Sequence, residues 1–144
     1  MPNEDIKKLL NENDVVQAVH KYLEEKGFEV ESANTKETGI DIFGRKNDEH
    51  WIIEAKGETS SEKSSKRYGK LMTKNQHYSQ VSTCLYKLIQ RKNKEVSKKG
   101  FNYGMAFPKN TIFKDLIKSI YPTVSKLEIS IFWVDNNLSV EQNS

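Results

Sequence analysis

Three charged residues of the kinds that act on phosphate esters lie in the stretch TGIDIFGRKNDEHWIIEAKGE, residues 38–58. They are Asp41, Glu54 and Lys56, and the apolar residues around them predict two adjacent β-strands joined by a polar tip at residues 47–49. Strands are poor in Asp, Glu and Lys, so strand formation alone does not explain these residues. Two carboxylates beside an ammonium group are suited to binding a divalent cation and hydrolysing a phosphodiester.

The predicted hairpin brings the three side chains together. Successive strand residues point to opposite faces, so Glu54 and Lys56 share one face, and Asp41 is expected opposite one of these two on the same face. Two close carboxylates repel each other and raise each other's pKa, and Mg²⁺ with its preference for oxygen ligands would compensate. A metal there would activate a bound water, and Lys56 would orient that water or stabilise the charge that builds on the phosphorane.

The elements that must hold this hairpin follow from the pattern of apolar residues. Residues 57–73 are expected to form a polar loop and residues 136–144 a frayed tail. The predicted elements are a helix at 11–26, strands at 28–33, 40–46 and 51–56, a helix at 74–92 with Tyr78, Val81, Leu85, Leu88 and Ile89 on its apolar face, a strand at 102–107, a helix at 111–121 stopped by Pro122, and a strand at 127–134. Helices on both faces of a mixed sheet bury such elements best, so we expect an α/β fold, a three-layer α-β-α sandwich with a central mixed sheet.

Composition sets limits on the kind of protein. The chain has 144 residues, of which 35% are hydrophobic and 30% charged, so a single domain spanning residues 1–144 is expected. The net charge of +3 is too small to imply a polyanionic partner by itself. The one cysteine excludes an intramolecular disulfide and a cysteine metal cluster. With no apolar signal core and no apolar run of about 20 residues, we expect a cytoplasmic protein without a membrane partner.

The residues Asp41 and Glu54-Ala55-Lys56 resemble the PD-(D/E)XK motif of the restriction-endonuclease-like nuclease superfamily. The expected order of elements is similar as well, with a core of α-β-β-β-α-β at about residues 10–107 and a C-terminal α-β extension at about 108–144. The stretch GIDIFGRK…IIEAKG is especially similar to the small Mrr-type and Holliday-junction-resolvase-type members. The proline that precedes the aspartate in the motif is Ile40 here, at a position that is lax in the superfamily.

The resemblance implies a role for each matching residue. Asp41, Glu54 and the carbonyl of Ala55 would bind Mg²⁺, with Mn²⁺ as a substitute, and Lys56 would be the catalytic lysine. Many members add a glutamate from the first helix, for which Glu12 is the candidate. Others add a glutamine from the helix after the motif, where Gln80 and Gln76 are weaker candidates. No small-molecule cofactor is implied.

A basic loop after the motif predicts a nucleic-acid partner. Its cations, interleaved with Ser and Thr, would contact phosphates and make binding depend on salt. They are Lys63, Lys66, Arg67, Lys70 and Lys74. A loop of this composition is also what a merely solvated segment would show.

The sequence therefore predicts a Mg²⁺-dependent endonuclease, a hydrolase that binds and cuts DNA, and a homodimer because one active site must pair to cut both strands. Two alternatives share the fold: a catalytically silent nucleic-acid-binding subunit, and a nuclease that cuts RNA. A third is a structural domain in which Asp41 and Lys56 form only an ion pair. Phosphate contacts carry no base or sugar information, so the sequence alone does not separate DNA from RNA.

Overall fold

A single mixed sheet forms the centre of the computed structural model, which describes residues 8–32, 39–60 and 69–143. Its six strands lie in the order in which they occur along the chain. They are β1 (Glu29–Ser32), β2 (Ile42–Lys46), β3 (Glu49–Ala55), β4 (Phe101–Pro108), β5 (Ile129–Val134) and β6 (Val140–Asn143). The pairs β3–β4 and β4–β5 are parallel and the other three pairs are antiparallel.

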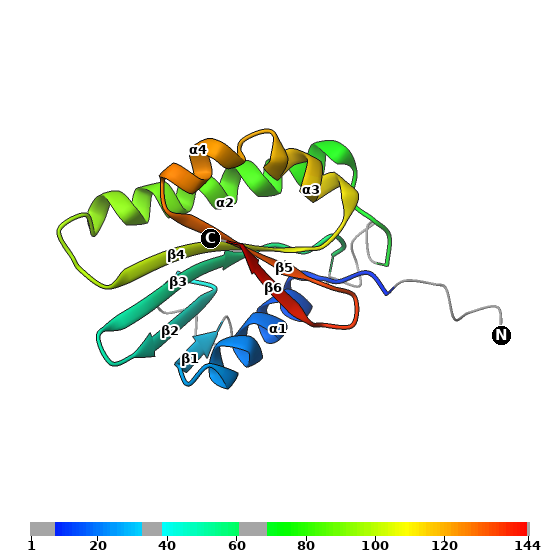
Figure 1. Ribbon diagram of the computed structural model, residues 1–144. Helices are drawn as coiled ribbons and strands as arrows, with labels where there is room; N and C mark the ends of the chain where they lie inside the picture. Colours follow the sequence, from blue (N-terminus) through cyan, green and yellow to red (C-terminus); the bar gives the residue numbers. More distant parts are fainter. Residues whose placement is uncertain (1–7, 33–38, 61–68, 144) are drawn as a thin grey trace.

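Helices cover both faces of this sheet, as Figure 1 shows. Helix α1 (Glu12–Glu25) lies on one face, and α2 (Lys74–Lys94), α3 (Thr111–Lys118) and α4 (Tyr121–Lys126) lie on the other. The expected three-layer α-β-α sandwich is therefore confirmed. The C-terminal extension holds two short helices and two strands, one of each more than the sequence analysis expected.

Each face of the sheet has its own apolar core. On the α1 side, the core includes Val15, Val19 and Leu23 of the helix with Ile53 of β3, all almost fully buried. The opposite core joins α2, α3 and α4 to the sheet. Because side chains alternate along β3, Ile53 and Ala55 face α1, whereas Ile52 belongs to the α2 side and Glu54 follows it on that face.

Local signals fix where the two long helices begin. Asn11 caps α1 in a capping box with Asp14, and Thr73 caps α2 in the same way with Gln76. At the end of α1, Gly27 adopts a positive φ of 94°, a conformation that glycine accepts without strain. Of the helices in the described residues, none has the length and apolar character needed to cross a membrane.

Two expectations about the C-terminal part were wrong. Residues 140–143 form the edge strand β6 and are not frayed, because they pair with β5 and the Tyr22 hydroxyl donates a hydrogen bond to Gln142 Oε1 (3.0 Å). Pro122 lies in the first turn of α4 and does not end a helix there. A proline is tolerated in a first turn because its missing N–H has no partner at that point.

The apolar face expected for α2 also differs in part. Val81 and Leu88 are buried as expected, but Tyr78 and Ile89 are 62% and 42% exposed. His77 and Cys84 complete the buried face instead, at helical spacing with Val81 and Leu88. The outer face of α2 therefore carries apolar side chains, while its buried face includes polar types.

Candidate active site

Asp41 lies opposite Glu54, at the point where β2 begins. The last pair in the β2–β3 ladder is Ile42 with Ile53, so one residue further the register sets Asp41 beside Glu54. The backbone N–H of Ala55 donates a hydrogen bond to Asp41 Oδ2 at 2.9 Å. The Ala55 N–H thus bonds to the Asp41 side chain where a further β2 carbonyl would otherwise accept it, and this bond holds the carboxylate at the end of the ladder. Glu54 is one of the two residues that Asp41 was expected to lie opposite.

Glu54 is a carboxylate buried in the sheet, with 4% of its surface exposed. Burial, followed by the neighbouring Asp41 carboxylate, raises the pKa of Glu54 to about 7. Lys87, a hydrogen bond from the Asp41 backbone and Lys56 oppose this rise without cancelling it. The raised pKa reflects a negative charge that the surrounding protein compensates only in part.

A buried thiol contacts the backbone of Glu54. Cys84 of α2 is fully buried, and its Sγ donates to the Glu54 carbonyl oxygen at 3.6 Å. Burial, followed by the nearby Glu54 carboxylate, raises the thiol pKa well above its usual value. Cys84 therefore stays a protonated packing residue, in agreement with the small core residue that its helical position predicts.

Lys56 follows directly after β3 and is half-buried. Its backbone N–H donates to the Ala106 carbonyl at 3.0 Å, which continues the pairing of β3 with β4 by one residue. The alternation of β3 therefore extends to Lys56 and sets its side chain on the face of Glu54. The metal-ligand role expected of the Ala55 carbonyl stays a prediction.

The start of α1 lies against the residue that follows Lys56. A Cβ added to Gly57 would fall 2.4 Å from the backbone nitrogen of Glu12, so only glycine permits this approach. Glu12 is the first residue of α1 and is half-buried. Within the described residues no three side chains of His, Cys, Asp or Glu are grouped to hold a metal ion, so Glu12 is near the motif but does not complete a three-carboxylate cluster.

The two glutamines of α2 have different positions. Gln80 is half-buried, and its Nε2 donates to the Gly57 carbonyl at 3.3 Å, next to the end of the motif. Gln76 instead accepts a hydrogen bond from the Thr73 N–H at 2.7 Å and serves the cap of its own helix. Of the two weaker candidates, the structure brings only Gln80 to the motif.

Sequence reasoning missed one residue that reaches the carboxylates. Lys87 of α2 places its Nζ 4.0 Å from Glu54 Oε1. A cavity of about 320 Å³ opens beside this pair, and its lining includes Gly39, Arg91 and Lys94. The available signal was the spacing of Lys87 from Gln80, seven residues or two helical turns, which sets both on one flank of α2.

The basic loop that was expected to contact phosphates falls largely outside the described residues. Lys63, Lys66 and Arg67 lie there, so their expected role stays a prediction. Lys70 and Lys74 are described and exposed, and Lys74 is the first residue of α2.

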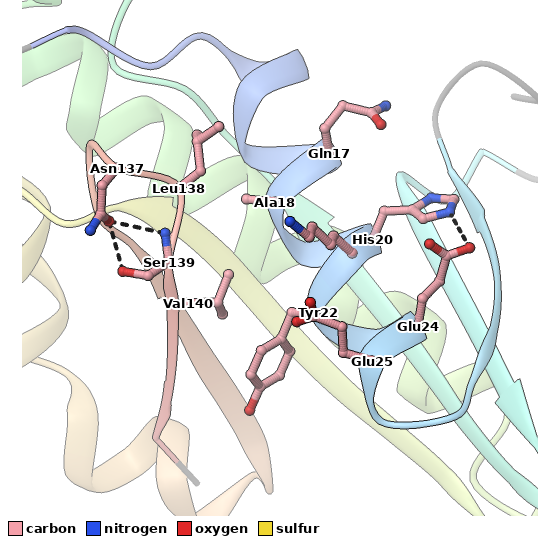
Figure 2. Close-up of a pocket in the computed structure, with 11 residues that line it drawn as sticks. Gln17, Ala18, His20, Tyr22, Glu24, Glu25, Asn137, Leu138, Ser139 and Val140 are labelled. Carbon is pink, nitrogen blue, oxygen red and sulfur yellow. Dashed lines mark hydrogen bonds and ion pairs between the residues drawn. The ribbon is translucent and has the colours of Figure 1, made fainter.

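A larger groove lies away from these residues, between α1 and the connection from β5 to β6 (Figure 2). Its volume is about 1010 Å³, and its lining includes Gln17, His20, Tyr22 and Leu138. His20 Nε2 pairs with Glu24 within the same helix at 3.2 Å. None of the predicted catalytic residues lines this groove, so its size does not mark it as the active site.

Comparison with known proteins supports the fold. No protein-family model matches the chain, and no curated protein matches it significantly. The chain is similar to the crystal structure of an XisH family protein from Nostoc punctiforme PCC 73102, with a TM-score of 0.56 and 17% sequence identity. The similarity covers 90% of this chain and 97% of that one. At this identity the likeness shows a shared fold and does not assign an activity.

Proposed function

We propose that this protein is a restriction-endonuclease-like nuclease of the PD-(D/E)XK type that hydrolyses DNA phosphodiester bonds with the help of Mg²⁺. The observation that carries the proposal is the Asp41–Glu54 pair. The Ala55 N–H holds the Asp41 carboxylate opposite Glu54, on the sheet face to which Lys56 also belongs. An ion pair that served only stability would not need a second carboxylate at this place.

The donor set suits a hard divalent cation. Asp41 and Glu54 supply carboxylate oxygens, and Glu54 is a buried acid whose charge the protein compensates incompletely. These two residues, with the Ala55 carbonyl, would hold the metal. When bound, Mg²⁺ would supply Lewis-acid activation of the phosphate and of a water molecule.

The protein's own residues divide the remaining work. Lys56 would hold the attacking water or the phosphate oxygen by donating hydrogen bonds from its ammonium group. Gln80, through its contact with the Gly57 carbonyl, would keep the segment after Lys56 against α2. We further propose that the protein works in the cytoplasm as a homodimer, since cutting both strands of a duplex needs two active sites.

A cleavage assay tests this function. Purified protein is incubated with supercoiled plasmid, linear duplex, branched DNA and RNA, with Mg²⁺, Mn²⁺ or EDTA. We expect cleavage of DNA that needs the metal, that Asp41→Asn and Glu54→Gln abolish, and that Lys56→Ala reduces by at least about 100-fold, the usual contribution of a group acting on the reacting atoms. Lys56→Ala should still bind metal.

Other outcomes of the cleavage assay would change or reject the proposed function. Metal-dependent cleavage of RNA alone would reverse the substrate assignment. Binding of metal and DNA without cleavage of any substrate would leave a nucleic-acid-binding subunit. Equal activity of wild type and Lys56→Ala would remove this site from the reaction.

A further inference from the structure

The flank of α2 beside the candidate active site carries three cations. Lys87, Arg91 and Lys94 are separated by four and three residues, so they lie along one side of the helix. All three line the cavity that opens onto Glu54. We refer to these three residues as the α2 basic row.

The place of the α2 basic row is not explained by helix stability alone. Cations near a helix C-terminus interact favourably with the helix dipole, and Arg91, Lys92 and Lys94 all lie in the last turn of α2. Lys87 lies outside that turn, and Lys92 packs over the Tyr103 ring at 4.9 Å from its centroid. The dipole therefore accounts for part of the charge but not for its concentration along the cavity.

Most of the positive charge of the α2 basic row is exposed to solvent. Lys87 and Lys94 are exposed, and the Lys87 side chain retains 52% of its accessible surface although its Nζ approaches Glu54. The acidic groups that face the α2 basic row are Glu54 in the sheet and Glu95, whose carboxylate lies 4.0 Å from the Arg91 guanidinium. Glu95 also accepts a hydrogen bond from the Tyr103 hydroxyl at 2.7 Å, so its charge is shared between two partners.

The geometry points to the α2 basic row as the surface that holds the phosphate backbone of the DNA strand to be cut. Lys87 would contact the phosphate next to Asp41 and Glu54, and Arg91 and Lys94 would contact phosphates further along the same strand. The row extends about 10 Å along the helix axis, enough for neighbouring phosphates of one strand. This inference rests on the proposed function. It assigns to α2 the kind of phosphate contact that was expected of the basic loop after the motif.

The dimensions of the cavity are consistent with this assignment. Its volume of about 320 Å³ is near ten times the share of one water molecule in the liquid, about 30 Å³, so it has room for a phosphodiester group with bridging waters. Gln80 extends the same flank of α2 toward the end of the motif. The strand would therefore follow α2 between the helix and the end of β3.

The test is the salt dependence of DNA binding, measured by fluorescence anisotropy with a short labelled duplex in EDTA, where no cleavage occurs. The variant K87Q/K94Q removes two charges and leaves Arg91 with Glu95. Its matched control is K114Q/K118Q, which removes two exposed lysines of α3 that do not line the Glu54 cavity. Each phosphate contact contributes about 0.9 to the slope of log K against log salt concentration.

We expect the slope to fall by about 1.8 in K87Q/K94Q and to change little in K114Q/K118Q, with a further fall of about 0.9 when R91Q is added. Circular dichroism and thermal unfolding verify that each variant is folded. Equal slopes for K87Q/K94Q and its control would overturn the inference, as would absence of salt-dependent DNA binding by the wild type.

The salt-dependence measurement and the cleavage assay together separate the two proposals. A reduced slope in K87Q/K94Q with no cleavage by the wild type would support the phosphate contacts and reject hydrolysis. Metal-dependent cleavage by the wild type with an unchanged slope in K87Q/K94Q would support hydrolysis and reject the α2 basic row as its phosphate-binding surface.

Discussion

At the scale of single residues, the charge of Glu54 is the central feature of the site. A buried carboxylate next to a second carboxylate destabilises the fold once both are ionised. Lys87 approaches to 4.0 Å, and Lys56 also lowers the pKa of Glu54, yet this pKa remains raised to about 7. A functional group held at such a cost is typical of active sites, where binding or catalysis benefits from it.

The pKa of Glu54 predicts how stability depends on pH. Because its pKa is about 7 in the folded state and 4.5 as the reference value, the folded state binds the proton more tightly, and the free energy of unfolding should fall as pH rises from about 4.5 to about 7. Glu54→Gln removes the titrating charge. We expect this variant to unfold with a free energy up to about 3 kcal/mol higher than wild type at pH 8, and with little difference at pH 4.

Urea unfolding in EDTA at a series of pH values measures this difference. The control is Glu31→Gln, an exposed glutamate on the edge strand β1, which should change stability by less than about 0.5 kcal/mol at every pH. If Glu54→Gln were less stable than wild type at pH 8, the carboxylate would be a structural ion-pair partner.

At the scale of elements, the site depends on how closely the start of α1 approaches the end of β3. An alanine Cβ at Gly57 would meet backbone atoms of Asn11 and Glu12, which cannot move aside as the end of a side chain can. We expect Gly57→Ala to lower the free energy of unfolding by about 1–3 kcal/mol and to lower cleavage activity in the fraction that remains folded. Chemical unfolding and plasmid cleavage, measured on the same samples, check both effects.

Gly44 offers the matched control. Its added Cβ would lie 3.2 Å from the Leu23 Cδ1 atom, the flexible end of a side chain. Gly44→Ala should therefore destabilise less than Gly57→Ala and leave the activity of folded protein unchanged. Equal effects of the two substitutions on activity would show that the α1–β3 approach has no special connection with the site.

The elements also show what sequence patterns predict and what they miss. Capping residues and helical periodicity are local, so α1 and α2 were predicted within about two residues of their observed ends. The strand β6 was missed because its alternation of half-buried and exposed residues is short and polar, and its stability comes from pairing with β5. Tyr78 and Ile89 were placed on the apolar face of α2 because hydrophobicity alone does not reveal that the polar His77 occupies it.

The same distinction applies to the candidate site. Strand alternation and the hairpin tip, both readable from the sequence, restrict the partner of Asp41 to Glu54 or Lys56, and the observed register of β2 and β3 selects Glu54. Helical spacing could set Lys87 on the flank of α2 that carries Gln80, but its approach to Glu54 depends on how α2 crosses the sheet, which no local pattern contains. The contact of Gly57 with the start of α1 is likewise a product of tertiary packing.

At the scale of the whole molecule, a buried acid joins segments that are far apart in the chain. Glu58 is 7% exposed; its Oε2 accepts from the Leu10 N–H at 2.9 Å and its Oε1 accepts from Asn110 Nδ2 at 2.9 Å. Asn110 also caps α3 and lies 3.2 Å from His77 Nε2 on α2. Glu58 therefore connects the segment before α1, the end of the motif and the starts of α2 and α3.

The two hydrogen bonds of Glu58 predict a structural role that can be separated from catalysis. A glutamine has one acceptor oxygen where the carboxylate has two, so Glu58→Gln must place an amide NH₂ against either the Leu10 N–H or Asn110 Nδ2. We expect the free energy of unfolding to fall by about 1–3 kcal/mol, the cost of leaving a buried donor without its acceptor. The exposed Glu141, paired with Lys109 at 3.3 Å, provides the control Glu141→Gln, which should cost less than about 1 kcal/mol.

Calorimetric titration with Mn²⁺ of the folded Glu58→Gln protein should give the wild-type affinity, because the Glu58 carboxylate accepts hydrogen bonds from the Leu10 backbone and from Asn110 and does not belong to the proposed metal site. A loss of metal affinity in folded Glu58→Gln would instead make Glu58 part of the site that Asp41 and Glu54 define.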